Sequence, residues 1–336
     1  MAETSTSTST PSPSHEMKTY KGSCHCGAIA FSLTLPRIEW VSECNCSICF
    51  RKGYAWVFPP EGAKNLVFEE GKGEEGLRGY EFAGETTGHL FCPVCGTGVM
   101  GKRHHAEPGM DIGINARTLE DVDVWKLEVR KVDGASYEPK WIPHELIGPE
   151  PTAEIEDAKM YYGSCHCGAT TIALKNKGGI DSSTEMVECN CTICYKVRPT
   201  FFSFLSSPAL LSMKINHPQR SLRHIYPLTT QLSILTNPSH PLTSYTFGRK
   251  MMKHMFCPKC GIQVYTVKVD VDKETYRLYG RPGSEELGER ELERQWRAWG
   301  EWTCFNVRNL EGVVWDDVGV KNTYWRGFLE GVDIGR

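Results

Sequence analysis

The sequence lacks the long apolar run that a membrane-spanning helix needs. A crossing takes about 20 consecutive apolar residues, whereas the most apolar stretch, residues 201–211, is short and contains Pro208. Residues 1–16 are rich in serine, threonine and proline, and they have neither the apolar core of a secretory signal nor the arginines of a mitochondrial transit peptide. We therefore expect a soluble, cytoplasmic protein in which residues 1–16 form a disordered tail.

An excess of either charge is also lacking. The chain has 38 Lys and Arg against 41 Asp and Glu, which gives a formal net charge of −3 at pH 7. Proteins that bind polyanions or anionic membranes usually carry a marked positive charge, so the composition disfavours nucleic acid and membrane surfaces as partners. A length of 336 residues, 40% of them hydrophobic, suffices for one large or two medium domains. The sequence does not indicate an oligomeric state.

Cysteine, by contrast, is abundant, with 15 residues. Thiols stay reduced in the cytosol, so this enrichment favours metal binding over disulfides. The cysteines form a pattern that occurs twice in the same order: a Cys-x-Cys pair, a Cys-x-Cys-x-x-Cys run and a Cys-x-x-Cys pair. The first set is Cys24, Cys26, Cys44, Cys46, Cys49, Cys92 and Cys95, and the second is Cys165, Cys167, Cys189, Cys191, Cys194, Cys257 and Cys260.

The remaining positions of the repeat carry further expectations. Only Cys304 lies outside the two sets; it aligns with Gly113, and we expect it to be a small buried residue. Asn115 and Asn306 are each followed two residues later by arginine, and we expect each to fix a turn or strand end through side-chain hydrogen bonds.

The repeat divides the chain into two domains. We predict a first domain at residues 17–143, a Pro- and Glu-rich linker at 144–157 and a second domain at 158–336. Both read as mainly β, because apolar residues alternate at 29–35 and further strand candidates lie at 54–58, 64–68 and 264–269. One charged helix is predicted at 285–302, where Glu286 and Arg290, and Glu293 and Arg297, are spaced four apart.

Seven thiols per repeat fit two metal sites of different kinds. Structural zinc takes four protein ligands, whereas catalytic zinc takes three and keeps one open position. Zinc is the expected metal for all-thiolate ligands, and iron is the alternative. Spacing alone does not decide which pairs share a metal ion. Cys92 and Cys95 could close a four-ligand site either with Cys24 and Cys26 or with Cys44 and Cys46.

The motifs Gly-Ser-Cys-His-Cys-Gly, Glu-Cys-Asn-Cys-x-Ile-Cys and Phe-Cys-Pro-x-Cys-Gly together resemble the glutathione-dependent formaldehyde-activating enzyme family, which also includes centromere protein V. The resemblance implies two tandem Mss4-like β domains with up to two zinc ions each. It implies structural zinc at Cys24, Cys26, Cys92 and Cys95 and at Cys165, Cys167, Cys257 and Cys260. It also implies reactive zinc at Cys44, Cys46 and Cys49 and at Cys189, Cys191 and Cys194.

The activity that the resemblance implies is a carbon–sulfur lyase reaction that joins glutathione, as co-substrate, to formaldehyde or releases it. Small thiols and aldehydes would be the substrates, and formaldehyde detoxification the role. The alternative, which centromere protein V suggests, is a zinc module that binds a partner without catalysis. Residues outside the cysteines do not select formaldehyde over a larger electrophile.

Several charged residues near the cysteines are candidates for other roles. Arg51 and Lys52 follow the run of Cys44, Cys46 and Cys49 and could pair with glutathione carboxylates, or be ordinary surface charges. His89 and His254 precede a Cys-x-x-Cys pair by three residues and could orient a ligand or carry a proton, or be structural. For His25 and His166, each between two cysteines, a surface position is expected.

The repeats diverge after Cys194. Cys49 and Cys92 are separated by 42 residues but Cys194 and Cys257 by 62, and no Asp or Glu occurs between 189 and 269. Residues 197–240 are either a genuine loop or translated non-coding sequence; we favour the second interpretation, which continuous transcript reads across the segment would contradict. Either way the second reactive site is altered, so we expect the first domain to carry the catalysis. A second insertion is predicted near 269–300.

Overall fold

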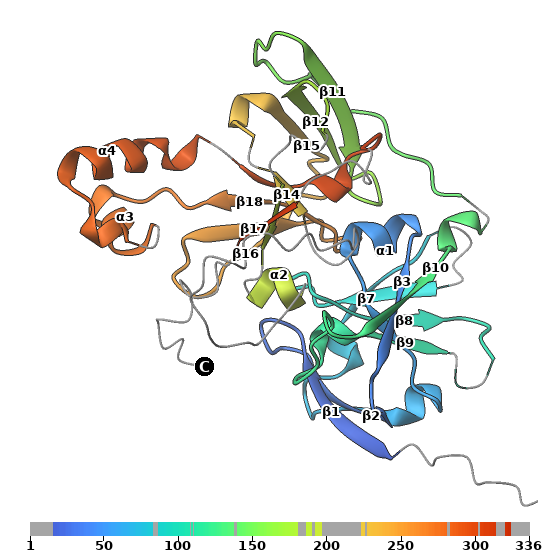
Figure 1. The fold of residues 1–336 in the computed structure, drawn as a ribbon. Helices are drawn as coiled ribbons and strands as arrows, with labels where there is room; N and C mark the ends of the chain where they lie inside the picture. Colours follow the sequence, from blue (N-terminus) through green and yellow to red (C-terminus); the bar gives the residue numbers. More distant parts are fainter. Residues whose placement is uncertain are drawn as a thin grey trace, which may run out of the picture.

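The computed structural model describes residues 16–82, 87–107, 109, 111–137, 140–180, 186–189, 192–196, 223–225, 227–280, 283–301, 303–313 and 320–323. Strands dominate these residues, as the alternating sequence pattern predicts, and the few helices are short (Figure 1). We call the part from β1 to β10 the first half and the part from β11 to β20 the second half.

The first half contains one α-helix among its described residues, α1, which lies between β3 and β4 in the chain. Its elements are β1 (Met17–Ser23), β2 (Ala30–Pro36), β3 (Trp40–Cys44), α1 (Ser47–Lys52), β4 (Trp56–Val57), β5 (Leu66–Phe68), β6 (Arg78–Tyr80), β7 (Thr87–Phe91), β8 (Gly98–Arg103), β9 (Ile112–Asn115) and β10 (Glu128–Val132).

The second half repeats this order and adds two helices before its last strands. Its elements are β11 (Ala158–Ser164), β12 (Thr170–Lys177), β13 (Met186–Cys189), α2 (Thr192–Lys196), β14 (Arg223–Ile225), β15 (Leu232–Thr236), β16 (Thr243–Tyr245), β17 (Met252–Phe256), β18 (Gln263–Lys268), α3 (Lys273–Tyr279), α4 (Glu289–Arg297), β19 (Cys304–Asn306) and β20 (Val320–Thr323).

The two halves have the same sheet topology. In the first half a three-stranded sheet has the order β1-β2-β5 and a seven-stranded sheet the order β10-β3-β4-β9-β8-β7-β6. The second half has β11-β12-β15 and, read in reverse, β20-β13-β14-β19-β18-β17-β16. In each larger sheet only the pair formed with the last strand is parallel, β10 with β3 and β20 with β13. Each strand of one half therefore has a counterpart in the other.

The core of the first half lies between its two sheets. Alternate residues of β2, such as Phe31 and Leu33, pack with Met100 and Ile114 from β8 and β9. Each such side chain contributes about 1.5–3 kcal/mol to folding through burial, which explains why apolar residues recur at every second position. The alternation at 29–35 thus correctly predicts a strand with one buried face.

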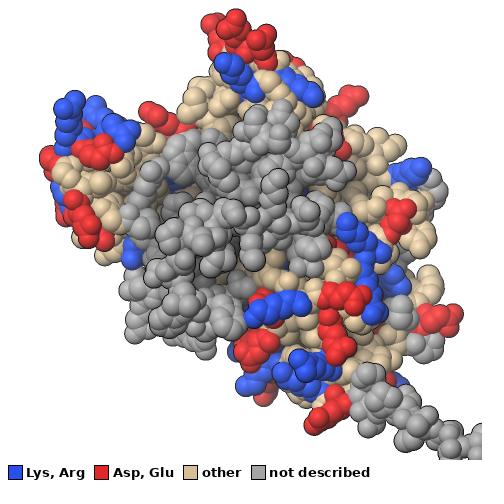
Figure 2. Space-filling model, in the orientation of Figure 1, with Lys and Arg blue, Asp and Glu red and all other residues tan. Residues whose placement is uncertain are grey.

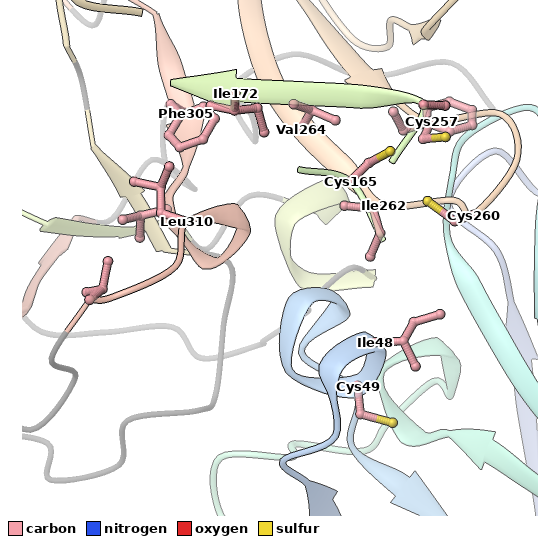
Figure 3. Close-up of a cluster of buried hydrophobic side chains, with 14 of the residues drawn as sticks. Ile48, Cys49, Cys165, Ile172, Cys257, Cys260, Ile262, Val264, Phe305 and Leu310 are labelled. Carbon is pink, nitrogen blue, oxygen red and sulfur yellow. The ribbon is translucent and has the colours of Figure 1, made fainter. Parts of the chain in front are cut away.

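A second core cluster runs across the boundary between the halves. Ile48 and Cys49 of α1 belong to the same buried cluster as Cys260 and Ile262 of the second half. Figure 3 shows this arrangement, with the α1 side chains lying opposite the turn that carries Cys260. The halves are therefore joined by apolar packing and not only by the linker.

Part of the segment predicted as an insertion belongs to the sheets. Residues 232–236 form β15, which pairs with residues 170–174 of β12 in antiparallel register, and residues 223–225 form β14. The predicted insertion at residues 197–240 is therefore too long. Its last part supplies β14 and β15, which correspond to β4 and β5 of the first half. Residues 197–222 lie outside the described residues.

The helical region after β18 also differs from its prediction. The charged helix α4 begins at Glu289 because Gly288 is its N-cap, so Glu286 lies outside it, whereas Glu293 and Arg297 form the expected ion pair at 2.6 Å. The helix α3 was not predicted. Cys304 is 8% exposed in β19, which confirms the expected buried position.

The visible surface carries mixed charge. Acidic and basic side chains alternate over the described parts of the face in Figure 2, including the region of α3 and α4. Among the described residues, none of the helices has both the length and the apolar character that a bilayer crossing requires.

Candidate metal centres

Four cysteines meet where two turns of the first half approach each other. The turn between β1 and β2 carries Cys24 and Cys26, and the turn between β7 and β8 carries Cys92 and Cys95. All four Sγ atoms lie within 4.8 Å of one another. The contacts of Cys26 are 3.5 Å to Cys24 and 3.7 Å to Cys92. A zinc ion with Zn–S bonds of about 2.3 Å places its ligands ~3.8 Å apart, so this first four-cysteine cluster fits zinc.

The turns are shaped by glycine and backbone hydrogen bonds. Gly96 has φ +75° and donates its N–H to the carbonyl of Cys92 at 2.9 Å. This left-handed conformation suits glycine, and it turns the chain tightly enough for both sulfurs to face one point. Gly27, with φ +76°, plays the same part in the other turn.

The second half builds a matching cluster from Cys165, Cys167, Cys257 and Cys260. Their Sγ atoms also lie within 4.8 Å of one another, and those of Cys165 and Cys257 lie 3.7 and 3.6 Å from that of Cys167. In both halves, therefore, the first pair meets the last pair, as the resemblance implies, and the alternative closure by Cys44 and Cys46 is not formed. No described cysteine is in a disulfide.

The three-cysteine cluster of the first half lies at the junction of β3 and α1. Cys44 ends β3, Cys46 is the N-cap of α1 and Cys49 lies in its first turns. Their Sγ atoms fall within 4.8 Å of one another. The cluster offers one protein ligand fewer than a closed zinc site, which is the donor set of a metal site with an open position.

Thiol hydrogen bonds make the three cysteines unequal. Hydrogen bonds from Cys46 and Cys49, and from the backbone N–H groups of Cys46 and Gly134, lower the pKa of Cys44 to about 3. The interaction with Cys44 raises the pKa of Cys46 to about 11 and raises that of Cys49 above its ordinary value. The cluster thus holds one thiolate readily, and a metal must displace the protons of the other two.

Aromatic side chains line one side of this cluster. The indole N–H of Trp56 donates to the Sγ atom of Cys49 at 3.3 Å, and the ring of Trp56 lies 4.2 Å from that of Tyr54. His89 stacks on Tyr54 with ring centroids 5.8 Å apart. Burial lowers the pKa of His89 to about 3, so its imidazole is neutral at physiological pH. Its Nδ1 atom has no hydrogen-bond partner among the described residues.

His254, the counterpart of His89, has a different environment. Its Nδ1 atom lies 3.1 Å from Nε2 of Gln263 and 3.2 Å from Oγ1 of Thr266. These contacts favour a structural role for His254. His89, in contrast, lies beside Trp56, whose indole contacts the three-cysteine cluster.

The three-cysteine run of the second half, Cys189, Cys191 and Cys194, is only partly described. Cys194 is 3% exposed in α2 and packs with Ile193, Tyr245 and Phe247. The side chain of Cys189 and the whole of Cys191 lie outside the described residues.

His166 is buried, contrary to the surface position expected for it, whereas His25 is only partly buried. The side chain of each contacts the other half. His166 is 1% exposed and lies 2.8 Å from Oγ of Ser47 and 2.9 Å from Oη of Tyr80. Sequence reasoning could not find these contacts, because the residues that surround the histidine are distant in the chain.

Arg51 and Lys52 also face the second half. Arg51 is 4% exposed, forms an ion pair with Glu311 and lies 4.1 Å above the ring of Trp141. Lys52 donates to the carbonyl of Gly261 at 2.8 Å. Both cations are therefore used in contacts between the halves, and their contact with glutathione stays a prediction.

A small cavity lies beside these cations. It is lined by Arg51, Lys52, Tyr54, Lys196 and Gln263, among others, so both halves contribute. Its volume of about 20 Å³ suits a water molecule rather than a tripeptide. This space is thus a feature of the junction and not a substrate pocket for glutathione.

Asn115 and Asn306 have the role predicted for them. Each caps a short 3-10 turn by accepting a hydrogen bond from the backbone N–H of the arginine two residues later. Gly134 and Trp56, in contrast, were not predicted to contact the three-cysteine cluster. Trp56 lies in a predicted strand, and a lone glycine gives no signal of a neighbour far away in the sequence.

Comparison with known proteins finds one similar solved structure and one matching family model. A crystal structure of a Rhodobacter sphaeroides protein from a structural genomics programme has 28% sequence identity over 33% of this chain and 99% of that chain, with a TM-score of 0.29. Residues 19–131 match the sequence model of a family described as glutathione-dependent formaldehyde-activating enzyme. This segment includes the first four-cysteine cluster and the three-cysteine cluster. Residues 19–131 are therefore similar to the glutathione-dependent formaldehyde-activating enzyme family.

Proposed function

We propose that this protein is a zinc-dependent carbon–sulfur lyase that forms or cleaves a glutathione–aldehyde adduct at Cys44, Cys46 and Cys49. The observation that carries the proposal is the convergence of these three Sγ atoms, with one ligand fewer than a closed site, inside the segment that matches the family. The two four-cysteine clusters would hold structural zinc.

A zinc ion held by the three cysteines would act as a Lewis acid and would lower the pKa of a thiol bound beside them. In the forward reaction the glutathione sulfur bonds to the carbonyl carbon of the aldehyde. The carbonyl π electrons pass to oxygen, which takes the thiol proton, and the product is an S-hydroxyalkyl thioether. The reverse reaction breaks the same carbon–sulfur bond.

The side chains around the cluster have distinct tasks in this proposal. Trp56 donates to Cys49 and so stabilises the sulfur as a thiolate. Neutral His89 can offer its unpartnered Nδ1 atom to an oxygen or proton of the substrate. The rings of Tyr54 and Trp56 limit the access of water on this side.

We further propose that the second half is a second copy of the same domain, with the first copy carrying most of the activity. The repeated cysteine order and the identical sheet topology support a duplication. In the sequence, residues 197–222 lie between α2 and β14, where the first half has only the short connection between α1 and β4, so the sequence that follows the second three-cysteine run differs from that of the first.

The test compares Cys46→Ser with Cys191→Ser in the full chain. The measurement is glutathione-dependent consumption of formaldehyde by protein whose metal content is known. Cys46→Ser should abolish activity, and Cys191→Ser should retain most of it. Equal losses would contradict the asymmetry between the halves.

The same assay separates the enzyme from its alternative. A parent protein that holds metal at the three-cysteine cluster but consumes no aldehyde with glutathione would overturn the lyase assignment. A non-catalytic zinc module that binds a partner would then explain the clusters better.

A further inference from the structure

His166 of the second half contacts the first half at the start of α1, directly after Cys46 of the three-cysteine cluster. Its Nε2 atom lies 2.8 Å from Oγ of Ser47, the residue directly after Cys46, and its Nδ1 atom lies 2.9 Å from Oη of Tyr80. Both ring nitrogens therefore have partners in the first half, although His166 itself stands between Cys165 and Cys167 of the second four-cysteine cluster.

The imidazole of His166 has little freedom to move. Trp141 donates its indole N–H to the carbonyl of His166 at 2.9 Å and stacks on the imidazole at 5.1 Å. Phe82 meets the same ring edge-on at 4.3 Å. With the backbone held by the cysteine turn and the ring enclosed by aromatic groups, His166 presents Nε2 to Ser47 in one orientation.

The other end of α1 is held by the same cluster. Lys52 donates to the carbonyl of Gly261, which follows Cys260. A Cβ atom on Gly261 would lie 2.6 Å from Cγ of Phe91 and 2.7 Å from Nζ of Lys52, so the contact requires glycine at this position. The helix α1 is thus fixed at its first and last residues by the two turns of the second four-cysteine cluster.

These contacts matter because α1 is only 6 residues long. An isolated helix of fewer than about 12 residues is marginal in water, so its position depends on tertiary contacts. Cys46 and Cys49 are attached to α1, and the spacing of their Sγ atoms follows the helix. Groups that orient metal ligands typically change metal affinity by about 10–100-fold when removed.

We propose that the second four-cysteine cluster positions the three-cysteine cluster of the first half through α1, with His166 as the positioning residue. The inference rests on the proposed function only in taking Cys44, Cys46 and Cys49 to be metal ligands. It assigns to the second half a role in the first half's site, whether or not the second half is itself active.

The chain contains its own control for this idea. His25, in the first four-cysteine cluster, contacts the second half in the matching way: Nε2 lies 3.0 Å from Oγ1 of Thr192 and Nδ1 lies 2.8 Å from Oη of Tyr245. Thr192 begins α2 as Ser47 begins α1. Ser47→Ala and Thr192→Ala therefore remove equivalent hydrogen bonds, but only the first concerns α1.

The experiment measures zinc release from the full-length, zinc-loaded protein to a colorimetric chelator. Cys46→Ser identifies the fraction released by the three-cysteine cluster, because that fraction disappears in this variant. Ser47→Ala and His166→Gln should speed its release by about 10-fold or more, whereas Thr192→Ala and His25→Gln should change it less than twofold. The double variant Ser47→Ala, His166→Gln should release zinc no faster than the faster single variant.

Cobalt substitution supplies an independent spectroscopic readout. Ser47→Ala and His166→Gln should shift the visible absorption of cobalt at the three-cysteine cluster, and Thr192→Ala should not. Parent-like release and spectra for Ser47→Ala would overturn the inference, as would an equal effect of Thr192→Ala. If His166→Gln does not fold, the zinc release of Ser47→Ala and Tyr80→Phe, which each remove one hydrogen bond to His166, tests the inference instead.

The outcome is independent of catalysis, because neither readout uses glutathione or aldehyde. An inactive parent whose zinc release responds to Ser47→Ala would leave this inference standing and remove the proposed lyase function. An active parent whose release is indifferent to Ser47→Ala would do the reverse.

Discussion

Gly134 lies against the Sγ atom of Cys44. A Cβ atom built on Gly134 would stand 2.3 Å from this sulfur and 3.1 Å from the Cβ atom of Cys46. The loop that follows β10 therefore covers the three-cysteine cluster closely, and its backbone N–H at Gly134 contributes to the low pKa of Cys44.

Gly134→Ala should displace this loop and weaken metal binding at the cluster by about 10-fold or more, while costing roughly 1–3 kcal/mol of stability through overpacking. Elemental analysis after a mild chelator wash measures the loss. Gly79→Ala is the control, since a Cβ there meets nothing within 4 Å. Parent-like metal retention in Gly134→Ala would contradict the close cover.

A chelator should remove zinc from the two kinds of cluster one after the other. The four-cysteine clusters have all ligands from the protein and hold the turns between strands, so their zinc should resist a mild chelator and its removal should unfold the sheets around them. Zinc at the three-cysteine cluster should leave first, with little change in the circular dichroism spectrum. Cys260→Ser should lose one firmly held ion per chain. Loss of all zinc in a single step would count against two classes of site.

Acid should destabilise the fold through its buried histidines. The folded-state pKa of His89 is lowered to about 3 by burial, from an ordinary value of 6.5. Between these values the unfolded chain binds the extra proton, so stability falls as the pH drops below 6.5. For one histidine the loss is ~1.4 kcal/mol per pH unit in this window.

His89→Gln removes this contribution. Denaturant titrations of the zinc-loaded protein at pH 7.5 and 5.5 should show a smaller loss of unfolding free energy in the variant than in the parent. Exposed His240 provides the control, and His240→Gln should behave like the parent. An identical pH dependence for His89→Gln would mean that His89 takes up its proton in the folded state.

The buried asparagine caps should be costly to remove in both halves. Asn115 donates to the carbonyl of Gly98 at 2.8 Å, and Asn306 donates to the carbonyl of Gln263 at 2.9 Å. Alanine at position 115 removes the side-chain donor to the carbonyl of Gly98, and alanine at position 306 removes one of the two donors to the carbonyl of Gln263, which keeps Asn309. The loss of these buried hydrogen bonds should cost about 1–3 kcal/mol. Thermal unfolding measures this loss. The control is Asn176, which is only partly buried and bonds through its side chain to the exposed carbonyl of Lys177, and Asn176→Ala should lie within about 0.5 kcal/mol of the parent.

Local sequence patterns predicted the parts of this structure that depend on neighbours in the chain. The alternation around Phe31 and Leu33 predicted β2, because a strand buries every second residue. The cysteine pattern predicted metal sites of two kinds, and Asn115 was correctly expected to fix a turn through its side chain. The helix α4 was predicted, but its start was misplaced because charge spacing does not reveal the capping Gly288.

The sequence by itself therefore determined the β-rich class, the cysteine groups and the donor chemistry that favours a metal. Only the tertiary structure decided which residues support those groups. His166 is set between two cysteines by sequence, but its partner Ser47 lies 119 residues away in the chain. Periodicity records which face of an element is buried and not what lies opposite that face, so the junction between the halves emerges only when distant strands pack.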